Sequence, residues 1–205
     1  ILQANLREAS SVDSYILSQD EEDLFCPEFT FHAFRYIEIT GITEPVPLEH
    51  VSGIMLSSVK KVEGIFKCSN PLINQFASNV KYSMQGNYLS IPTDCPQRNE
   101  RMGWTGDTHI FARTATYQAD VRNFLFRNMQ AMVDLQRGDG HLPNIAPVGG
   151  GFGGITYESA LIILTWELYQ QYGDKHIIKV YYPAMDRWME TMQKEGLPGE
   201  EYKGF

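Results

Sequence analysis

A short segment of this chain, residues 91–107, combines acidic, basic and aromatic side chains at close spacing. Its charged residues and its indole are Asp94, Glu100, Asp107, Arg98, Arg101 and Trp104. Pro92 and Pro96 fix φ and remove backbone donors, so a continuous helix is not expected here. Crowded carboxylates push one another's pKa values apart, so one can stay protonated near neutral pH while another stays ionised. The segment therefore contains the side chains that general acid catalysis needs.

The same residue types also fit a purely structural role, in which an Arg–carboxylate network ties a surface loop to a core. Composition alone leaves these two interpretations open. Cys95 lies in the same segment, but no base is evident beside it in the sequence, so we interpret it as structural rather than nucleophilic.

The overall composition excludes several classes of partner. A net charge of −8, without a basic patch, argues against nucleic acid or an anionic membrane surface. The longest apolar run, residues 160–164, is too short for membrane insertion. The 3 cysteines form no disulfide framework, and the 5 histidines have no metal-ligand spacing. We therefore expect neither a metal nor a cofactor, and the compartment (periplasmic, secreted or cytoplasmic) stays open.

The first part of the chain has the pattern of β-structure. Aromatic and β-branched residues alternate with period two over residues 29–40, which predicts a strand. Residues 54–60 and 64–67 are further strand candidates. The first 65 or so residues therefore look like the end of a β-rich domain.

From Ser69 onward the apolar period becomes that of a helix. Asn70 and Pro71 supply an N-cap and a first-turn proline, and the repeat ends at Gly86. Further helices are predicted over residues 105–118, 121–136, 159–172 and 175–194. The first two turns of the third of these are apolar on nearly every face, so we expect that helix to be buried between two layers.

A second long loop, residues 137–154, ends in a run of glycines that formally satisfies G-x-G-x-x-G. No strand precedes it, so we reject a dinucleotide-binding interpretation and favour a linker or a mobile loop at a site rim. His141 in this loop could contact a ligand. For Glu158, at the following helix start, and for the helix-borne His109, a structural role is the default.

These motifs, taken together, resemble those of the bacterial α-L-rhamnosidases of glycoside hydrolase family 78. The matching stretches are FTFHAFRY (29–36), CSNPL (68–72), PTDCPQR (92–98), ERMGWTGD (100–107), WELYQQYGD (166–174) and YPAM (182–185). The pattern D-C-P-Q-R-x-E-R-x-G-W-x-G-D over residues 94–107 is long and specific.

The resemblance implies a multi-domain α and β protein. Residues 1–65 would be the end of a β-sandwich, and residues 66–205 the first helical hairpins of an (α/α)6 barrel that is incomplete in this chain. The implied activity is the release of terminal L-rhamnose from glycosides or polysaccharides, with inversion. In an inverting hydrolase one carboxylic acid protonates the leaving oxygen and a second carboxylate activates water, the two lying about 6.5–9.5 Å apart.

By motif position, Glu100 matches the general acid of that family. Asp94, Arg98 and Asp107 match residues that hold sugar hydroxyls and tune the acid, and Trp104 matches an aromatic wall of the sugar pocket. The resemblance places the general base beyond the last residue of this chain, so we expect residues 1–205 alone to be inactive.

One departure from the family pattern concerns sugar specificity. Many relatives have Trp-x-Asp-Ala after the glycine loop, whereas residues 157–160 read Tyr-Glu-Ser-Ala. Tyr157 can keep the aromatic surface, but the acid has moved to Glu158 or been lost. Two alternatives to an α-L-rhamnosidase therefore remain: a non-catalytic carbohydrate-binding or structural module, and a related exo-glycosidase for another sugar. An open barrel also exposes an apolar face, which favours an oligomer.

Overall fold

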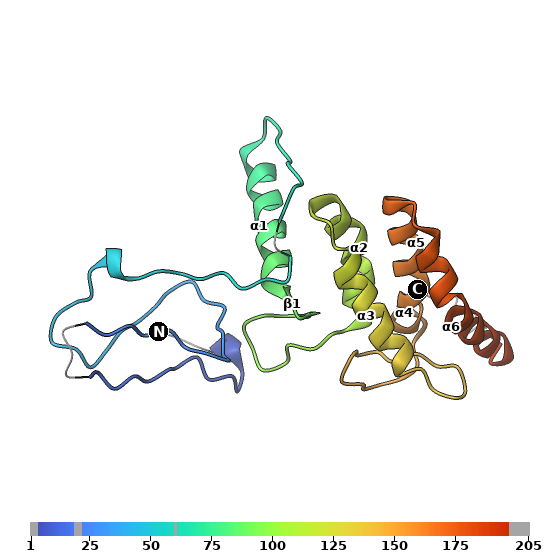
Figure 1. Ribbon diagram of the computed structural model, residues 1–205, viewed down its shortest axis with the longest axis horizontal. Helices are drawn as coiled ribbons and strands as arrows, with labels where there is room; N and C mark the ends of the chain where they lie inside the picture. The colour runs from blue at the N-terminus through green and yellow to red at the C-terminus, as the bar shows by residue number, and fades with distance from the viewer. Residues whose placement is uncertain (1–3, 19–21, 60, 197–205) are drawn as a thin grey trace. The chain divides into compact units, whose positions relative to one another are not determined.

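The computed structural model describes residues 4–18, 22–59 and 61–196, and the chain divides into two compact units (Figure 1). The first unit comprises Ile1–Met55 and Cys95–Arg101, and the second comprises Leu56–Asp94 and Met102–Phe205. The charged segment identified from the sequence is thus divided between them.

The described residues of the first unit form two short 3-10 helices, η1 (Ala4–Leu6) and η2 (Leu48–His50), and no strand. The prediction of a strand over residues 29–40 is therefore wrong for this structure. A strand is held by hydrogen bonds to a neighbouring strand, and the described part of this unit offers none. Both faces of the alternating segment are exposed instead, as at Phe34 and Ile37.

The second unit is a set of helices with one two-stranded hairpin. Its elements are α1 (Pro71–Asn87), β1 (Tyr88–Leu89), β2 (Ile91–Pro92), α2 (Thr105–Gln118), α3 (Arg122–Asp134), α4 (Ile155–Glu158), α5 (Ala160–Tyr172) and α6 (Lys175–Lys194). The predicted helices over 105–118 and 175–194 are confirmed with the same bounds, and the others within a few residues. The short helix α4 was not predicted.

Local sequence explains where these helices begin and end. The Asn70 side chain accepts a hydrogen bond of 2.9 Å from the Leu72 amide and caps α1. Asp174 caps α6 in the same way, at 2.8 Å from the His176 amide. Gly173 ends α5 in the left-handed region at φ 66°, a conformation that favours glycine.

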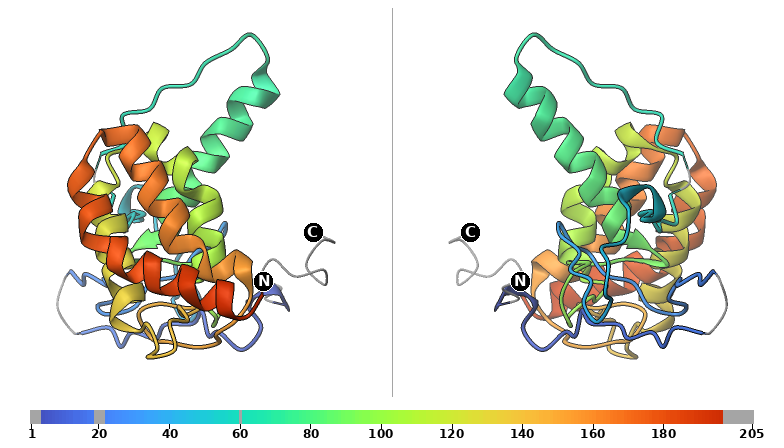
Figure 2. Two further views of the ribbon diagram at one scale, coloured as in Figure 1. Left: turned by 90° about the vertical axis from the view of Figure 1, so that its right-hand side faces the viewer. Right: turned by 90° about the vertical axis from the view of Figure 1, so that its left-hand side faces the viewer.

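Helix α5 is the centre of the hydrophobic core. It packs against α2, α3 and α6 (Figures 1 and 2). The side chains of Leu161, Leu164 and Leu168 are fully buried. The expected burial between layers is therefore found along this leucine face. It fails at Trp166, which is 53% exposed.

The other two predicted strands are also absent. Residues 54–59 form none, and Lys60 lies outside the described residues. Val62 makes a single antiparallel bridge with Ala119, and the amides of Glu63 and Gly64 both donate to the Gln118 carbonyl, each at 2.8 Å. The segment before α1 is thus fastened to the α2–α3 connection rather than to a sheet.

Two connections of the second unit carry or adjoin candidate functional residues. The β1–β2 hairpin turns at Ser90 and pairs Tyr88 with Pro92, just before Asp94. The long connection between α3 and α4 runs past the end of α3 (Figures 1 and 2). Within the described ranges, no helix combines the length and the apolar character needed to cross a bilayer.

Candidate active site

Glu100, the predicted general acid, is held by two arginines within the first unit. Its carboxylate lies 3.0 Å from Arg7 Nη1 and 2.8 Å from Arg98 Nη2, and its side chain is 23% exposed. The next residue, Arg101, donates to the Phe31 carbonyl at 3.1 Å and lies over the Phe31 ring at 4.3 Å. Glu100 is therefore a partly exposed carboxylate paired with two guanidinium groups, which is the Arg–carboxylate network of the structural interpretation, and its role as the acid stays a prediction.

The backbone around this loop is constrained at both ends. The Asp94 amide donates to the Met102 carbonyl at 3.0 Å, and the Met102 amide donates to Asp94 Oδ1 at 2.9 Å. These two bonds, both within the second unit, join Asp94 and Met102, the residues that directly precede and follow residues 95–101. Arg101 also has φ 45°, in the left-handed region that non-glycine residues rarely occupy.

Trp104 and Tyr157, predicted as aromatic surfaces, are brought together in the second unit. Their ring centroids lie 5.6 Å apart at an interplanar angle of 57°. Thr105 Oγ1 donates to the Tyr157 carbonyl at 3.0 Å, which fixes the backbone between them. Gly106 leaves the room that the Tyr157 ring occupies, because a Cβ there would lie 2.8 Å from Tyr157 Cε1.

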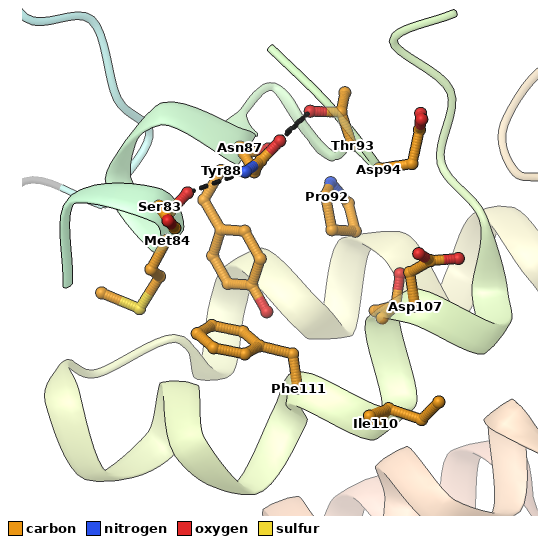
Figure 3. A pocket seen from close by; sticks show the side chains of 11 residues that line it. Ser83, Met84, Asn87, Tyr88, Pro92, Thr93, Asp94, Asp107, Ile110 and Phe111 are labelled. Atoms are coloured by element: carbon orange, nitrogen blue, oxygen red, sulfur yellow. Dashed lines mark hydrogen bonds between the residues drawn. The ribbon is translucent and has the colours of Figure 1, made fainter. Parts of the chain in front are cut away.

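Asp94 and Asp107, predicted to hold sugar hydroxyls, line one pocket of about 260 Å³ (Figure 3). Asp107 lies in the first turn of α2, where a carboxylate also complements the helix dipole. Apolar side chains supply much of the remaining wall: Met84, Tyr88, Pro92, Ile110 and Phe111. The pocket therefore combines acceptors for hydroxyl groups with an apolar surface.

A buried polar cluster, not predicted from the sequence, surrounds Glu158. This side chain is 1% exposed, and Trp188 Nε1 donates to it at 2.7 Å. His141 Nδ1 lies 3.0 Å from both of its oxygens, and the Gly153 amide donates to it as well. His141 Nε2 in turn lies 2.9 Å from Glu195. The carboxylate therefore fastens the glycine-containing connection to α6.

The contacts of this cluster show where the acidic residue next to Tyr157 is directed. The Glu158 carboxylate is directed to His141 and Trp188, whereas the Tyr157 ring contacts Trp104. Adjacent residues thus serve the core and the aromatic surface respectively. Glu158 does not take the place of a sugar-facing acid. Glu158 has the structural role expected for it, whereas His141, for which a ligand contact was considered, is bonded to Glu158 and Glu195.

We expect the stability of this protein to fall as pH rises through the titration of His141. Burial alone would lower the pKa of His141, but its hydrogen bonds to Glu158 and Glu195 outweigh burial and raise that pKa above 6.5. A histidine whose pKa is higher in the folded state than in the unfolded state stabilises the fold. This stabilisation is complete below the unfolded-state pKa and is lost as pH rises through the folded-state pKa. Melting temperatures of wild type and His141→Gln, compared over about pH 5.5 to 8.5, measure the effect.

The informative quantity is the difference in melting temperature between wild type and His141→Gln at each pH. His109 acts in the opposite direction, because burial lowers its pKa. The melting temperature of the variant should approach that of wild type as pH rises. A difference that stays constant with pH would mean that His141 carries no linked proton.

The sequence of this chain matches the models of two protein families. Residues 61–203 match the family model of the bacterial alpha-L-rhamnosidase 6 hairpin glycosidase domain. Residues 1–57 match that of the bacterial alpha-L-rhamnosidase concanavalin-like domain. The chain belongs to the bacterial α-L-rhamnosidase six-hairpin glycosidase family.

Named relatives agree with this assignment. The chain is 36% identical to an alpha-L-rhamnosidase of Streptomyces avermitilis, over 95% of this chain and 19% of that protein. It is also 36% identical to an alpha-L-rhamnosidase of Formosa agariphila, over 92% of this chain and 21% of the relative. The chain thus spans about a fifth of the length of these relatives.

Solved structures of the same family resemble this fold. The alpha-L-rhamnosidase from Dictyoglumus thermophilum matches with a TM-score of 0.65 at 35% identity, covering 68% of this chain and 16% of that one. The Streptomyces avermitilis alpha-L-rhamnosidase complexed with L-rhamnose matches with a TM-score of 0.65 at 35% identity, covering 68% and 14%.

Proposed function

We propose that this chain is part of an inverting exo-α-L-rhamnosidase and that it supplies the general acid, Glu100. The observation that carries the proposal is the family match together with the acidic and aromatic pattern over residues 94–107. In this proposal residues 1–65 are the end of a β-sandwich and residues 66–205 the first part of the (α/α)6 barrel. The substrate is a rhamnose-containing glycoside or polysaccharide.

The proposed roles follow from the chemistry of each side chain. Asp94 and Asp107 accept hydrogen bonds from sugar hydroxyls in the pocket that both line. Arg98 donates to the sugar and holds the Glu100 carboxylate, to which it is bonded at 2.8 Å. Trp104 and Tyr157 offer aromatic faces against which the methyl group of a deoxy sugar can pack.

In the proposed reaction Glu100 gives its proton to the glycosidic oxygen as the bond from that oxygen to the anomeric carbon breaks. A water molecule attacks the anomeric carbon from the opposite face and inverts its configuration. The carboxylate that activates this water is assigned to no residue of the present chain. Glu100 regains its proton before the next turnover.

The test is hydrolysis of p-nitrophenyl α-L-rhamnoside by residues 1–205 and by the longest natural polypeptide that contains them. We expect turnover by the long form alone, with the β-anomer of L-rhamnose as the first product in an NMR time course. Faster turnover of another glycoside in a panel of nitrophenyl glycosides would indicate a preference for a different sugar. Sugar-induced change of tryptophan fluorescence without turnover of any substrate would instead indicate a binding module.

A further inference from the structure

Tyr88 presents a hydroxyl group that the protein does not itself satisfy. The side chain lines the pocket that Asp94 and Asp107 also line, and it is 3% exposed. Its hydroxyl oxygen is buried and has no hydrogen-bond partner among the described residues. Buried polar groups nearly always have partners, because a hydroxyl removed from water loses its hydrogen bonds unless new ones replace them.

Other tyrosines packed against the same core show the usual arrangement. The Tyr181 hydroxyl donates to the Phe126 carbonyl at 2.9 Å. The Tyr172 hydroxyl accepts from the Val121 amide at 3.1 Å. The fold thus provides partners for two of its tyrosine hydroxyls, and the exception is the one in the pocket.

The remaining polar side chains of the pocket mostly have partners within the protein. Thr93 Oγ1 donates to the Asn87 carbonyl at 3.1 Å, and Thr108 Oγ1 donates to the Trp104 carbonyl at 2.8 Å. Asn87 Nδ2 donates to the Ser83 carbonyl at 2.9 Å. The Tyr88 hydroxyl, in contrast, uses neither its donor nor its acceptor capacity within the described residues.

The position of the Tyr88 ring is fixed by its neighbours. It stacks on Phe124 with centroids 4.6 Å apart and meets Phe111 edge-on at 6.1 Å. The Ser58 amide donates to the Tyr88 carbonyl at 2.7 Å and holds the backbone. Figure 3 shows the ring extending from the end of α1 with its hydroxyl directed toward α2, the helix that carries Phe111 and Asp107.

We propose that Tyr88 is a substrate-binding residue and that its hydroxyl forms a hydrogen bond with one hydroxyl group of a bound deoxy sugar. The inference rests on the proposed function of the pocket. A volume of about 260 Å³ holds roughly nine waters at ~30 Å³ each, which is space for one sugar ring rather than several. Burial also raises the pKa of the Tyr88 hydroxyl, which therefore keeps its proton near neutral pH.

The test is Tyr88→Phe in the longest natural polypeptide that contains this chain. We expect KM for p-nitrophenyl α-L-rhamnoside and the inhibition constant of L-rhamnose to rise about tenfold, as for the loss of one hydrogen bond. The melting temperature should stay the same or rise, because no internal hydrogen bond is removed. The matched control is Tyr181→Phe, which should lower the melting temperature and leave both constants unchanged.

Analogues of L-rhamnose that each lack one hydroxyl give a second, independent readout. Wild type should bind one analogue about tenfold more weakly than L-rhamnose, and Tyr88→Phe should not distinguish that pair. Unchanged KM and inhibition constants in Tyr88→Phe would overturn the inference while the proposed function stands. A melting temperature lowered as far as in Tyr181→Phe would also overturn it. Wild type that neither cleaves the rhamnoside nor binds L-rhamnose would refute the proposed function instead.

Discussion

Glu100→Gln is expected to lower kcat on an unactivated α-L-rhamnoside by about 10²–10⁴-fold, the usual contribution of a general acid. The alkoxide that leaves from such a substrate is too basic to depart without a proton. The p-nitrophenolate group departs without one, so turnover of p-nitrophenyl α-L-rhamnoside should fall much less. The glutamine has the shape of the glutamate and keeps an oxygen that can accept from Arg7 and Arg98. Steady-state kinetics on the long natural polypeptide measure both effects.

A matched surface substitution serves as the control for Glu100→Gln. The control is Glu63→Gln, at a carboxylate that pairs with Lys61 at 2.5 Å on the surface and should affect neither substrate. Equal losses on the two rhamnosides would assign Glu100 to the structural network rather than to proton transfer.

Glu158→Ala is expected to destabilise the helical unit by about 3 kcal/mol, within the range for breaking a buried charged cluster. The substitution leaves the indole N–H of Trp188 and the amide of Gly153 without their acceptor inside the protein. It also removes the carboxylate that favours the protonated form of His141. Urea unfolding monitored by tryptophan fluorescence measures the loss.

The matched control lies on helix α6. Glu190 pairs with Lys194 at 3.7 Å, and both side chains are well exposed, so Glu190→Ala should cost less than about 0.5 kcal/mol. Glu158→Gln, which keeps one acceptor oxygen, should lower the free energy of unfolding by an amount between those for Glu158→Ala and Glu190→Ala. Similar stabilities for Glu158→Ala and Glu190→Ala would show that the buried cluster contributes little.

The helices could be predicted because the information for them is local. Apolar residues at helical spacing, the caps at Asn70 and Asp174, and the stop at Gly173 all lie within or next to the helix concerned. The predicted strands depended on partners elsewhere in the chain. Alternation over residues 29–40 describes which side chains could share a face, but it does not supply the neighbouring strand that makes a sheet.

The candidate site shows the same division between local and tertiary information. The resemblance to the rhamnosidases implied a sugar-binding role for Asp94 and Asp107, and the structure places both at one pocket, while the role itself stays a prediction. Tyr88 gave no such indication, because a tyrosine before a short apolar segment usually belongs to a core. The bond from Trp188 to Glu158 joins residues thirty positions apart, in elements whose packing the sequence pattern did not specify.

The assignment of residues 95–101 to the first unit bears on how members of this family can be recombined. Arg7 bonds Glu100, and Phe31 stacks against Arg101, so residues near the N-terminus form part of the surroundings of Glu100. A chimera joined at residue 61, where the helical family match begins, would keep helices α1 to α6 but take these partners from another protein. Recombination between relatives is therefore expected to keep the contacts of Glu100 and Arg101 only where the N-terminal residues and residues 95–101 are inherited together.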